Sequence, residues 1–317
     1  MTPVRLVVAL ALAALLLFPL SGSTFYIQLL TKVMILAIFA MSLDLLVGYT
    51  GLVSLGHAAF FGLAGYGLAL IQPKYDPMSI LITLPAALAI CAAFAAATGA
   101  LVLRTRGIYF IMVTLAFAQM VYFVFHDTKL GGGSDGIYIN HKPVVGWGDL
   151  KLIDLENRAT LYYAVLVTML AVFVVLRRVL ASNFGRALQG IKVNEHRMRA
   201  IGFPVFRYQL GAYVLAGTIG GLSGYLSALQ FGFVNPEIVS WHQSGAVLMM
   251  VILGGMGTLS GPVIGAFVFV LLEEFFKDDT VFGALARHWQ LMMGVLVVLV
   301  ACFLPRGLVG LLGRRER

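Results

Sequence analysis

The stretch SNFGRALQGIKVNEHRMRAIGFPVFRYQ, residues 182–209, gathers positive charge between two long apolar runs. The 317-residue chain around it is 60% hydrophobic and only 11% charged, with a mean hydropathy of +0.94. Soluble proteins carry about 25% charged residues, so this composition indicates an integral membrane protein. A formal net charge of +8 would suggest a nucleic-acid partner in a soluble chain, so the placement of the charges has to be considered first.

Ten segments are apolar enough to be candidate membrane spans, since a span needs about 20 mostly apolar residues. We therefore expect an all-α integral membrane protein of about ten transmembrane helices, some of them short or broken. For residues 1–23 a cleaved secretory signal is the alternative, because Arg5 precedes an apolar run that ends in small residues. The ten candidate segments are residues 4–20, 27–48, 51–71, 78–103, 107–125, 160–178, 209–230, 243–257, 261–276 and 289–304.

The charges of the connecting loops predict the orientation, because cytoplasmic loops carry an excess of Lys and Arg. With both termini in the cytoplasm, the loops on that side hold fourteen basic residues against two acids, and the opposite side holds seven against eleven. This multi-pass arrangement places a loop over residues 179–208 in the cytoplasm. It places residues 126–159, the largest hydrophilic segment, outside the cytoplasm with room for a short hairpin. The positive net charge thus reflects the orientation of the chain in the membrane, and no nucleic-acid partner is expected.

The whole chain, residues 1–317, is expected to form a single polytopic transmembrane domain, because no hydrophilic segment is long enough to fold alone. Within it, GYTGLVS at 48–54 and GGMGTLS at 254–260 share one spacing of two glycines and a serine, and each lies between two apolar runs. This echo suggests two weakly related halves with broken helices at corresponding places, as many transporters have at the substrate path. The alternative is that the small residues only let helices pack closely.

Polar groups inside the apolar runs are the candidate substrate-pathway residues. A carboxylate such as Asp44 costs about 2.5 to 3.5 kcal/mol at membrane depth unless protein, water or a partner solvates it. His57 follows Ser54 by three residues, so the two share a face if that segment is helical. A histidine bonded to a neighbouring helix is the alternative for His57, and interhelical hydrogen bonding for Thr114 and Gln119. The full set is Asp44, Tyr49, Thr50, Ser54, His57, Thr114 and Gln119.

Catalytic and metal-binding motifs are absent from the sequence. No nucleophile, base and orienting group form a readable motif, and the HxxxH and HExxH metal spacings do not occur. Cys91 and Cys302 lie in apolar runs, as small hydrophobic residues do, and have no metal-ligand spacing. The phosphate-binding pattern GxxxxGK[ST] is missing as well, so we expect neither an enzyme nor a cofactor in this chain.

Residues 185–201 would form an amphipathic helix, because a step of 100° per residue separates an apolar from a polar side. Gly202 and Pro204 are expected to end it. A helix on anionic lipid headgroups and a plain positive-inside anchor are the alternatives to a docking role. The apolar side holds Leu188, Ile191, Met198 and Ile201, and the polar side holds Arg186, Gln189, Lys192, His196, Arg197 and Arg199.

The stretch GRALQGIKVNEHRMRAIGF resembles the cytoplasmic coupling segment of the permeases of branched-chain amino acid ABC importers. The other landmarks of this family are similar to GYTGLVSLGHAAFFGLAGY, RTRGIYFIMVTLAFAQM, GGGSDGI and VILGGMGTLSGPVIGA, and they occur in the family's order. The resemblance covers residues 35–312. The GGSDG loop and the GIYF segment make the chain similar to the M-type permease subunit of such importers.

The resemblance implies a bacterial inner-membrane complex with a second, H-type permease, two ATP-binding subunits that hold ATP and Mg, and a periplasmic substrate-binding protein. It implies transport of branched-chain amino acids, or of related small organic solutes, because Asp44 stands where the family commonly has an amide. It also implies that Arg186, Asn194, Glu195 and Arg197 contact the ATP-binding subunit. Lys192 and Arg199 complete the candidate coupling set.

Two rival functions remain at this point. In an ion-coupled secondary transporter, Asp44 and His57 would be the coupling groups. In an intramembrane enzyme, His57 would act as a base, although no partner constellation is visible.

Overall fold

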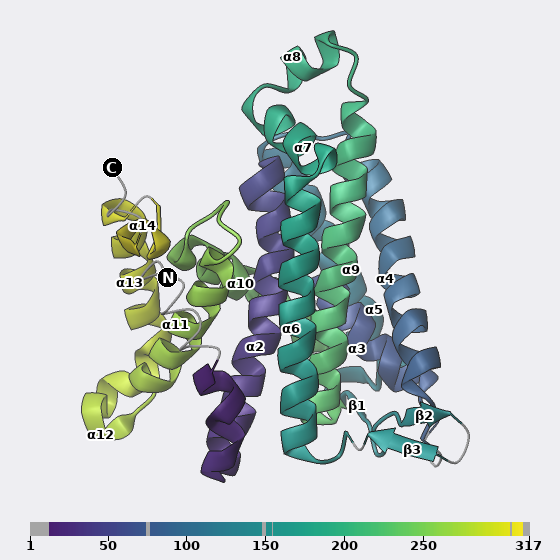
Figure 1. Ribbon diagram of the computed structural model, residues 1–317, viewed down its shortest axis with the longest axis vertical. Coiled ribbons are helices and arrows are strands. Elements are labelled where there is room, and N and C mark those ends of the chain that lie inside the picture. Colours follow the sequence, from purple (N-terminus) through teal and green to yellow (C-terminus); the bar gives the residue numbers. More distant parts are fainter. Residues whose placement is uncertain (1–12, 74–76, 148–149, 154, 305, 313–317) are drawn as a thin grey trace.

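The computed structural model describes residues 13–73, 77–147, 150–153, 155–304 and 306–312. After the short 3₁₀ helix η1 (Phe18–Ser21), long helices run along the long axis of the molecule (Figure 1). These are α2 (Thr24–Asp44), extended by the π-helix η2 (Leu45–Thr50), α4 (Ile80–Val102), α5 (Ile108–Asp127), α6 (Arg158–Ala181) and α9 (Val205–Phe231).

Six helices within the described residues are long and apolar enough to cross a membrane: Thr24–Thr50, Leu285–Phe303 and the four helices α4, α5, α6 and α9. Of the expected all-α membrane protein, the coarser statement, a mostly helical membrane protein, is thereby confirmed. Two of them form the core, since 89% of the apolar window in Thr24–Thr50 and 72% of that in α9 are buried. The other four turn much of their apolar surface outward, as helices that face lipid do.

Three expected spans form helices of only 14, 14 and 16 residues: α3 (Ala58–Ile71), α10 (Trp241–Gly254) and α11 (Gly261–Phe276), the last with the expected bounds. At 1.5 Å per residue they measure only about 21 to 24 Å, less than the roughly 30 Å of the hydrocarbon core. The expected span over 51–71 is wrong at its start, because helix begins only at Ala58. Most of the expected span over 4–20 lies outside the described residues.

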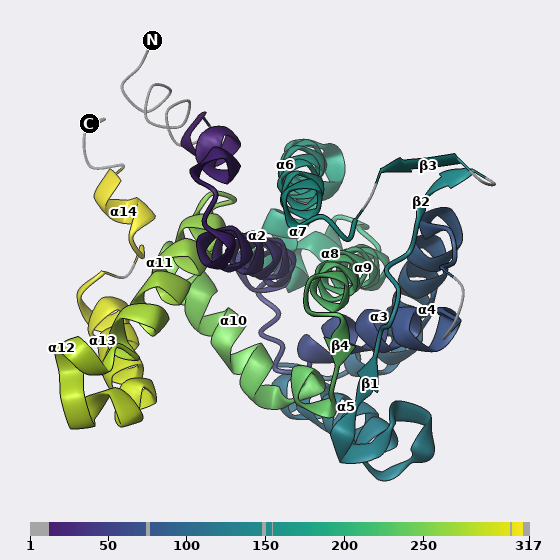
Figure 2. The ribbon, with the colours of Figure 1, turned by 90° about the horizontal axis from the view of Figure 1, so that it is seen from below.

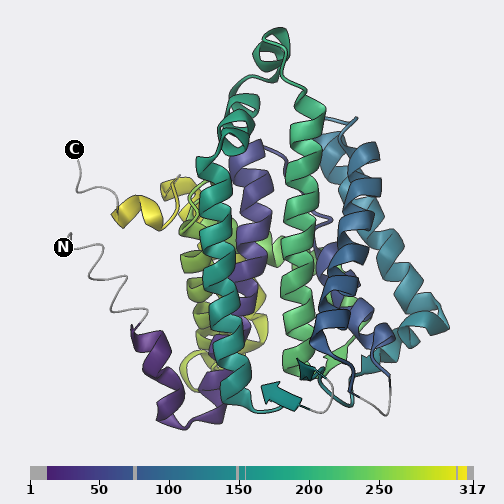
Figure 3. The ribbon, with the colours of Figure 1, turned by 45° about the vertical axis from the view of Figure 1, so that its right-hand side comes forward.

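The two ends of the bundle carry different structures (Figures 1 and 3). At one end α7 (Asn183–Val193) lies against the ends of α6 and α9, and α8 (Glu195–Ala200) projects beyond them. At the other end lie the antiparallel hairpin of β2 (Val145–Trp147) and β3 (Leu150–Ile153) and the antiparallel pair β1 (Ile137–Tyr138) and β4 (Phe233–Val234). The short hairpin that the sequence allowed within residues 126–159 is therefore present. The single-turn helices η3 (Lys129–Gly131), η4 (Gly133–Asp135) and η5 (Pro236–Val239) lie in the adjoining loops.

The C-terminal helices form a group on the side of α2 opposite to α6 and α9 (Figure 2). α10 and α11 pack against α2 and are followed by α12 (Asp279–Phe282), η6 (Gly283–His288), α13 (Trp289–Phe303) and α14 (Val309–Leu312). The buried helix α2 is thus held between the two parts of the chain.

Small residues allow close helix contacts in the core. α9 crosses α3 at Gly224, where an added Cβ would overlap the backbone carbonyl of Phe61. One turn earlier, Gly221 packs against the side chain of Cys91 on α4. Because a backbone carbonyl cannot move aside like a flexible side chain, glycine is required at 224 for the helices to approach this closely.

Replacing Gly224 with alanine should therefore destabilise the protein by about 1 to 3 kcal/mol through overpacking. Gly294→Ala is the matched control, because Gly294 lies within α13 and an added Cβ there would meet nothing within 4 Å. The thermal stability of both variants in detergent, followed by fluorescence-detected size exclusion, should fall only for Gly224→Ala. Equal stabilities would contradict the close α3–α9 packing.

Candidate functional site

The first glycine motif breaks the most deeply buried of the long helices in the described part of the chain. α2 widens into the π-helix η2, which ends at Gly51 with φ +76°, a left-handed backbone that glycine adopts without strain. Leu52 N–H still donates to the Leu46 carbonyl at 3.0 Å, and the Thr50 hydroxyl donates to the same carbonyl at 2.6 Å. Residues 51–57 then continue without helix until α3 begins. The break is thus closed by local hydrogen bonds.

The second glycine motif breaks the chain between α10 and α11. α10 ends at Gly254, and Gly255 and Gly257 have φ values of +122° and +76° before α11 starts at Gly261. An added Cβ at Gly254 would overlap the Gly261 carbonyl, so these helix ends approach at backbone distance. Both motifs therefore serve to break helices and to bring backbones close.

The two breaks meet through the carboxylate of Asp44. Its Oδ1 accepts a hydrogen bond from Gly257 N–H at 2.8 Å, and an added Cβ at Gly257 would lie 3.1 Å from the Gly48 carbonyl oxygen. Asp44 is fully buried, and its Oδ2 has no hydrogen-bond partner within the part of the chain that the structure describes. Nearby, the Tyr49 hydroxyl interacts with the backbone of Leu259.

Lys192, on α7, reaches the same point from the coupling segment. Its Nζ donates to the Gly48 carbonyl at 2.6 Å, and its charge interacts with the Asp44 carboxylate. A hydrogen bond that involves a charged group contributes about 1.5 to 3 kcal/mol, so the Gly257 N–H, aided by the charge of Lys192, offsets part of the cost of burying Asp44. We call this set, Asp44, Gly48, Lys192 and Gly257, the junction.

His57 lies in a separate pocket between α2, α3 and α9 and takes no part in the junction. The Ser42 hydroxyl donates its one proton to the Phe39 carbonyl at 2.7 Å, so at the 2.8 Å contact His57 Nε2 is the donor to Ser42 Oγ. The ring of His57 stacks on Phe39 and meets Phe60 edge-on. Nδ1 is buried without a hydrogen-bond partner among the described residues.

The remaining pathway candidates lie around the first break. Ser54 and His57 do not share a helix face, because residues 51–57 are not helical, and Ser54 Oγ instead accepts from Gly56 N–H at 3.3 Å. Gly56 packs against the backbone of Thr114 on α5, which brings Thr114 to the break. Gln119 lies further along α5 and is half-buried. Side chains of the buried candidates are shut off from solvent in this conformation: Asp44, Thr50, Ser54, His57 and Thr114.

The coupling segment consists of two helices and not of the single helix expected over 185–201. The extended backbone of Asn194 ends α7, and the Asn194 side chain caps α8 by accepting from Arg197 N–H at 2.9 Å. Leu188 and Ile191 are buried as expected, whereas Ile201, placed on the same apolar side, is 65% exposed. The break at Asn194 changes the direction in which the following side chains point, so the apolar side predicted from the sequence is present only in α7. α8 ends before Gly202, whose φ is +88°, as predicted.

The other coupling candidates differ in what they contact. Glu195 pairs with Arg106, in the loop between α4 and α5, at 3.1 Å, and with Arg199 at 2.5 Å. Such solvent-exposed pairs contribute only about 0.2 to 1 kcal/mol. Arg186 donates to the Asn183 side chain at 2.6 Å, and Arg197 is exposed.

Sequence reasoning missed three residues of these sites. Ser42 and Ser244, whose hydroxyl accepts from Ala58 N–H at 2.8 Å at the start of α3, are polar groups in apolar runs, the signal that identified Asp44. Arg106 gave no such signal, because its partner Glu195 lies 89 positions away. Local patterns cannot reveal a pair of that separation.

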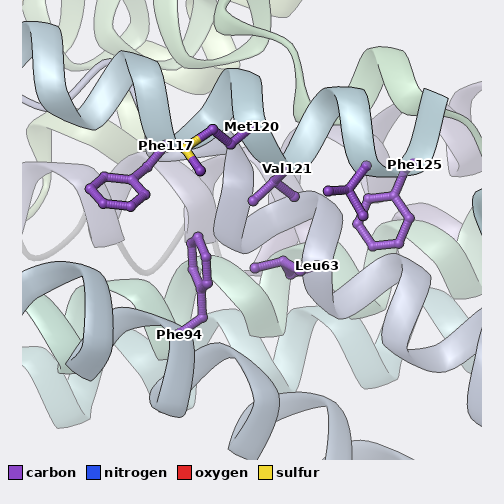
Figure 4. Close-up of a pocket in the computed structure, with 7 residues that line it drawn as sticks. Leu63, Phe94, Phe117, Met120, Val121 and Phe125 are labelled. Atoms are coloured by element: carbon purple, nitrogen blue, oxygen red, sulfur yellow. The ribbon is translucent and has the colours of Figure 1, made fainter. Parts of the chain in front are cut away.

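An apolar pocket of about 260 Å³ lies between α3, α4 and α5 (Figure 4). It is not part of the junction, and all its lining side chains are hydrophobic: Leu63, Phe94, Phe117, Met120, Val121, Val124 and Phe125.

Comparison with known proteins identifies the family. A family model described as "Branched-chain amino acid transport system / permease component" matches residues 25–301. The "High-affinity branched-chain amino acid transport system permease protein LivM" of Escherichia coli strain K12 is 32% identical, over 96% of this chain and 74% of the relative. LivM of Salmonella typhimurium strain LT2 is 30% identical, over 92% and 72%.

A more distant relative is the "Ribose import permease protein RbsC" of Escherichia coli strain K12, 23% identical over 71% of this chain and 68% of the relative. No solved structure matches the chain. The family match, which spans both helix breaks and the coupling segment, confirms the resemblance seen in the motifs and sets aside the ion-coupled transporter and the intramembrane enzyme. The chain belongs to the family of ABC-importer permeases that form the membrane component of branched-chain amino acid transport systems.

Proposed function

We propose that this chain is the M-type permease of an importer that pairs it with an H-type permease. Two ATP-binding subunits, which carry ATP and Mg, drive the pair, and a periplasmic binding protein delivers the solute. The solutes are branched-chain amino acids or related small organic molecules. Support comes from the near full-length similarity to LivM, whereas the weaker similarity to a ribose import permease keeps the solute class open to test.

The proposed setting is the bacterial inner membrane, with both termini in the cytoplasm and the chain folded as one polytopic domain. Residues 179–208 would face the cytoplasm and 126–159 the periplasm, and the opposite ends that these segments occupy support this (Figure 1). α3, α10 and α11 would cross the membrane as broken spans, giving about ten in two weakly related halves. The corresponding positions of the two glycine breaks support this division.

The observation that carries the proposal is the position of α7 and α8. They project from one end of the bundle with Leu188 and Ile191 buried against it, while Arg197 and His196 are exposed. The buried apolar side chains anchor the two helices to the bundle, and the exposed basic side chains form a surface that is suited to docking on another protein. The proposed coupling residues are Arg186, Lys192, Asn194, Glu195, Arg197 and Arg199.

The proposed solute path runs beside the first helix break, between residues 51–57 and α5. Five of its seven candidate groups are buried, so this conformation is closed, and transport would require the breaks to open. The candidates remain Asp44, Tyr49, Thr50, Ser54, His57, Thr114 and Gln119.

Purification of the chain from its native membrane in mild detergent tests the function directly. We expect two ATP-binding subunits and a second permease to remain bound, as identified by mass spectrometry. Proteoliposomes with this complex and its binding protein should take up labelled leucine only with ATP. Uptake driven by an ion gradient in a preparation of the chain alone would refute the proposal.

Charge reversal tests docking. Arg186→Glu combined with Arg197→Glu should abolish retention of the ATP-binding subunits while membrane insertion persists, because both cations lie on the exposed surface of the coupling segment. The matched control is Arg177→Glu with Arg178→Glu, two exposed cations at the end of α6. Retention and substrate-stimulated ATPase activity that match the wild type would remove these residues from the interface.

Asp44→Asn tests whether the carboxylate influences the solute. Asparagine keeps an oxygen that can accept from Gly257 N–H, so the junction should survive while the negative charge is lost. We expect a changed order of preference among leucine, a dicarboxylic amino acid and an amide in competition uptake assays. The exposed Asp279→Asn serves as control. An unchanged order of preference would assign Asp44 to structure alone.

A further inference from the structure

Lys192 is exposed, but its side chain contacts the first helix break at two points. An added Cβ at Gly51 would lie 3.3 Å from Lys192 Cγ, so the side-chain stem runs directly over Gly51. The ammonium then donates to the Gly48 carbonyl at 2.6 Å. That carbonyl belongs to the last turn of η2, where helix carbonyls lack intrahelical donors and attract cations. The geometry matches a lysine that caps a helix end within its own chain.

The helix that carries Lys192 is fixed to the bundle on the same side. Leu188, one turn before Lys192, is fully buried, and Ile191 is only 3% exposed. Gly190 lies against the Met198 side chain, which closes α7 onto α8. α7 therefore has little freedom to slide over η2, and a displacement of α7 would be passed to the break.

The second link between the coupling segment and the membrane helices is weaker. Glu195 reaches Arg106 across an exposed gap, with 54% of the Arg106 side chain accessible, and shares its oxygen with Arg199. Ion pairs in water are screened and hold long side chains loosely. Lys192 is exposed as well, but its acceptor, the Gly48 carbonyl, belongs to a buried residue, and this makes Lys192 the firmer of the two connections.

We propose that Lys192 is a positioning residue that couples movement of α7 to the helix break between α2 and α3, and not a contact to the ATP-binding subunit. This inference rests on the proposed importer function and deepens it. When the ATP-binding subunits move the coupling segment, Lys192 displaces the Gly48 carbonyl. Through the adjoining Asp44–Gly257 hydrogen bond, that movement reaches the second break.

The test uses the whole complex in proteoliposomes with its binding protein, and measures solute transported per ATP hydrolysed together with the amount of ATP-binding subunit retained. Lys192→Met keeps the stem and removes the donor. We expect its transport-to-hydrolysis ratio to fall about tenfold or more, because tenfold is the lower end of the effect of losing one charged hydrogen bond, with wild-type retention of the ATP-binding subunits.

Two further variants control the experiment. Lys192→Arg keeps a cationic donor and should restore most of the ratio, which a purely packing role would not explain. Arg177→Met removes an exposed cation near the coupling segment and should leave the ratio unchanged. Should Lys192→Met fail to insert, Lys192→Gln, too short to reach Gly48, takes its place with the same expected loss.

The outcomes separate the two proposals. A wild-type ratio in Lys192→Met overturns this inference alone, and so does loss of the ATP-binding subunits from Lys192→Met, which would make Lys192 a docking contact. A wild-type preparation that contains no ATP-binding subunit overturns the importer function, and the inference with it.

Discussion

A single buried carboxylate holds the two helix breaks of this permease together. Asp44 Oδ1 accepts the Gly257 N–H, and a carboxylate in an apolar interior is stable only where such donors and a counter-charge are present. Lys192 supplies the counter-charge from outside the helical core. The junction therefore places α2, the α10–α11 connection and the coupling segment at one point.

Glycine makes this meeting possible. At Gly48 an added Cβ would overlap the Asp44 carboxylate, and at Gly257 the backbone has positive φ and passes beside the Gly48 carbonyl. Close packing and helix breaking are alternative roles for a glycine motif, yet here they coincide. The backbones can approach only because the helices are interrupted, and the interrupted ends expose the N–H and C=O groups that Asp44 and Lys192 bind.

The sequence was informative about elements and less so about their interruptions. Apolar runs located the long helices, and Asp44 stood out because a charge in such a run needs a partner. The start of α3 at Ala58 and the break at Asn194 were missed, because apolar residues continue through the first and polar residues through the second. The partners themselves, Gly257 for Asp44 and Arg106 for Glu195, lie far away in sequence and became visible only in the fold.

If Lys192 links them as proposed, α7 and the first helix break move as one body. Spin labels at Gln189, exposed on α7, and at Val53, just after η2, measure this directly in the assembled complex with and without ATP. We expect the Gln189–Val53 distance to stay constant while the distance from Gln189 to a label at Ile108, at the start of α5, changes between the two states. A Gln189–Val53 distance that changes by several ångströms on ATP binding would contradict it.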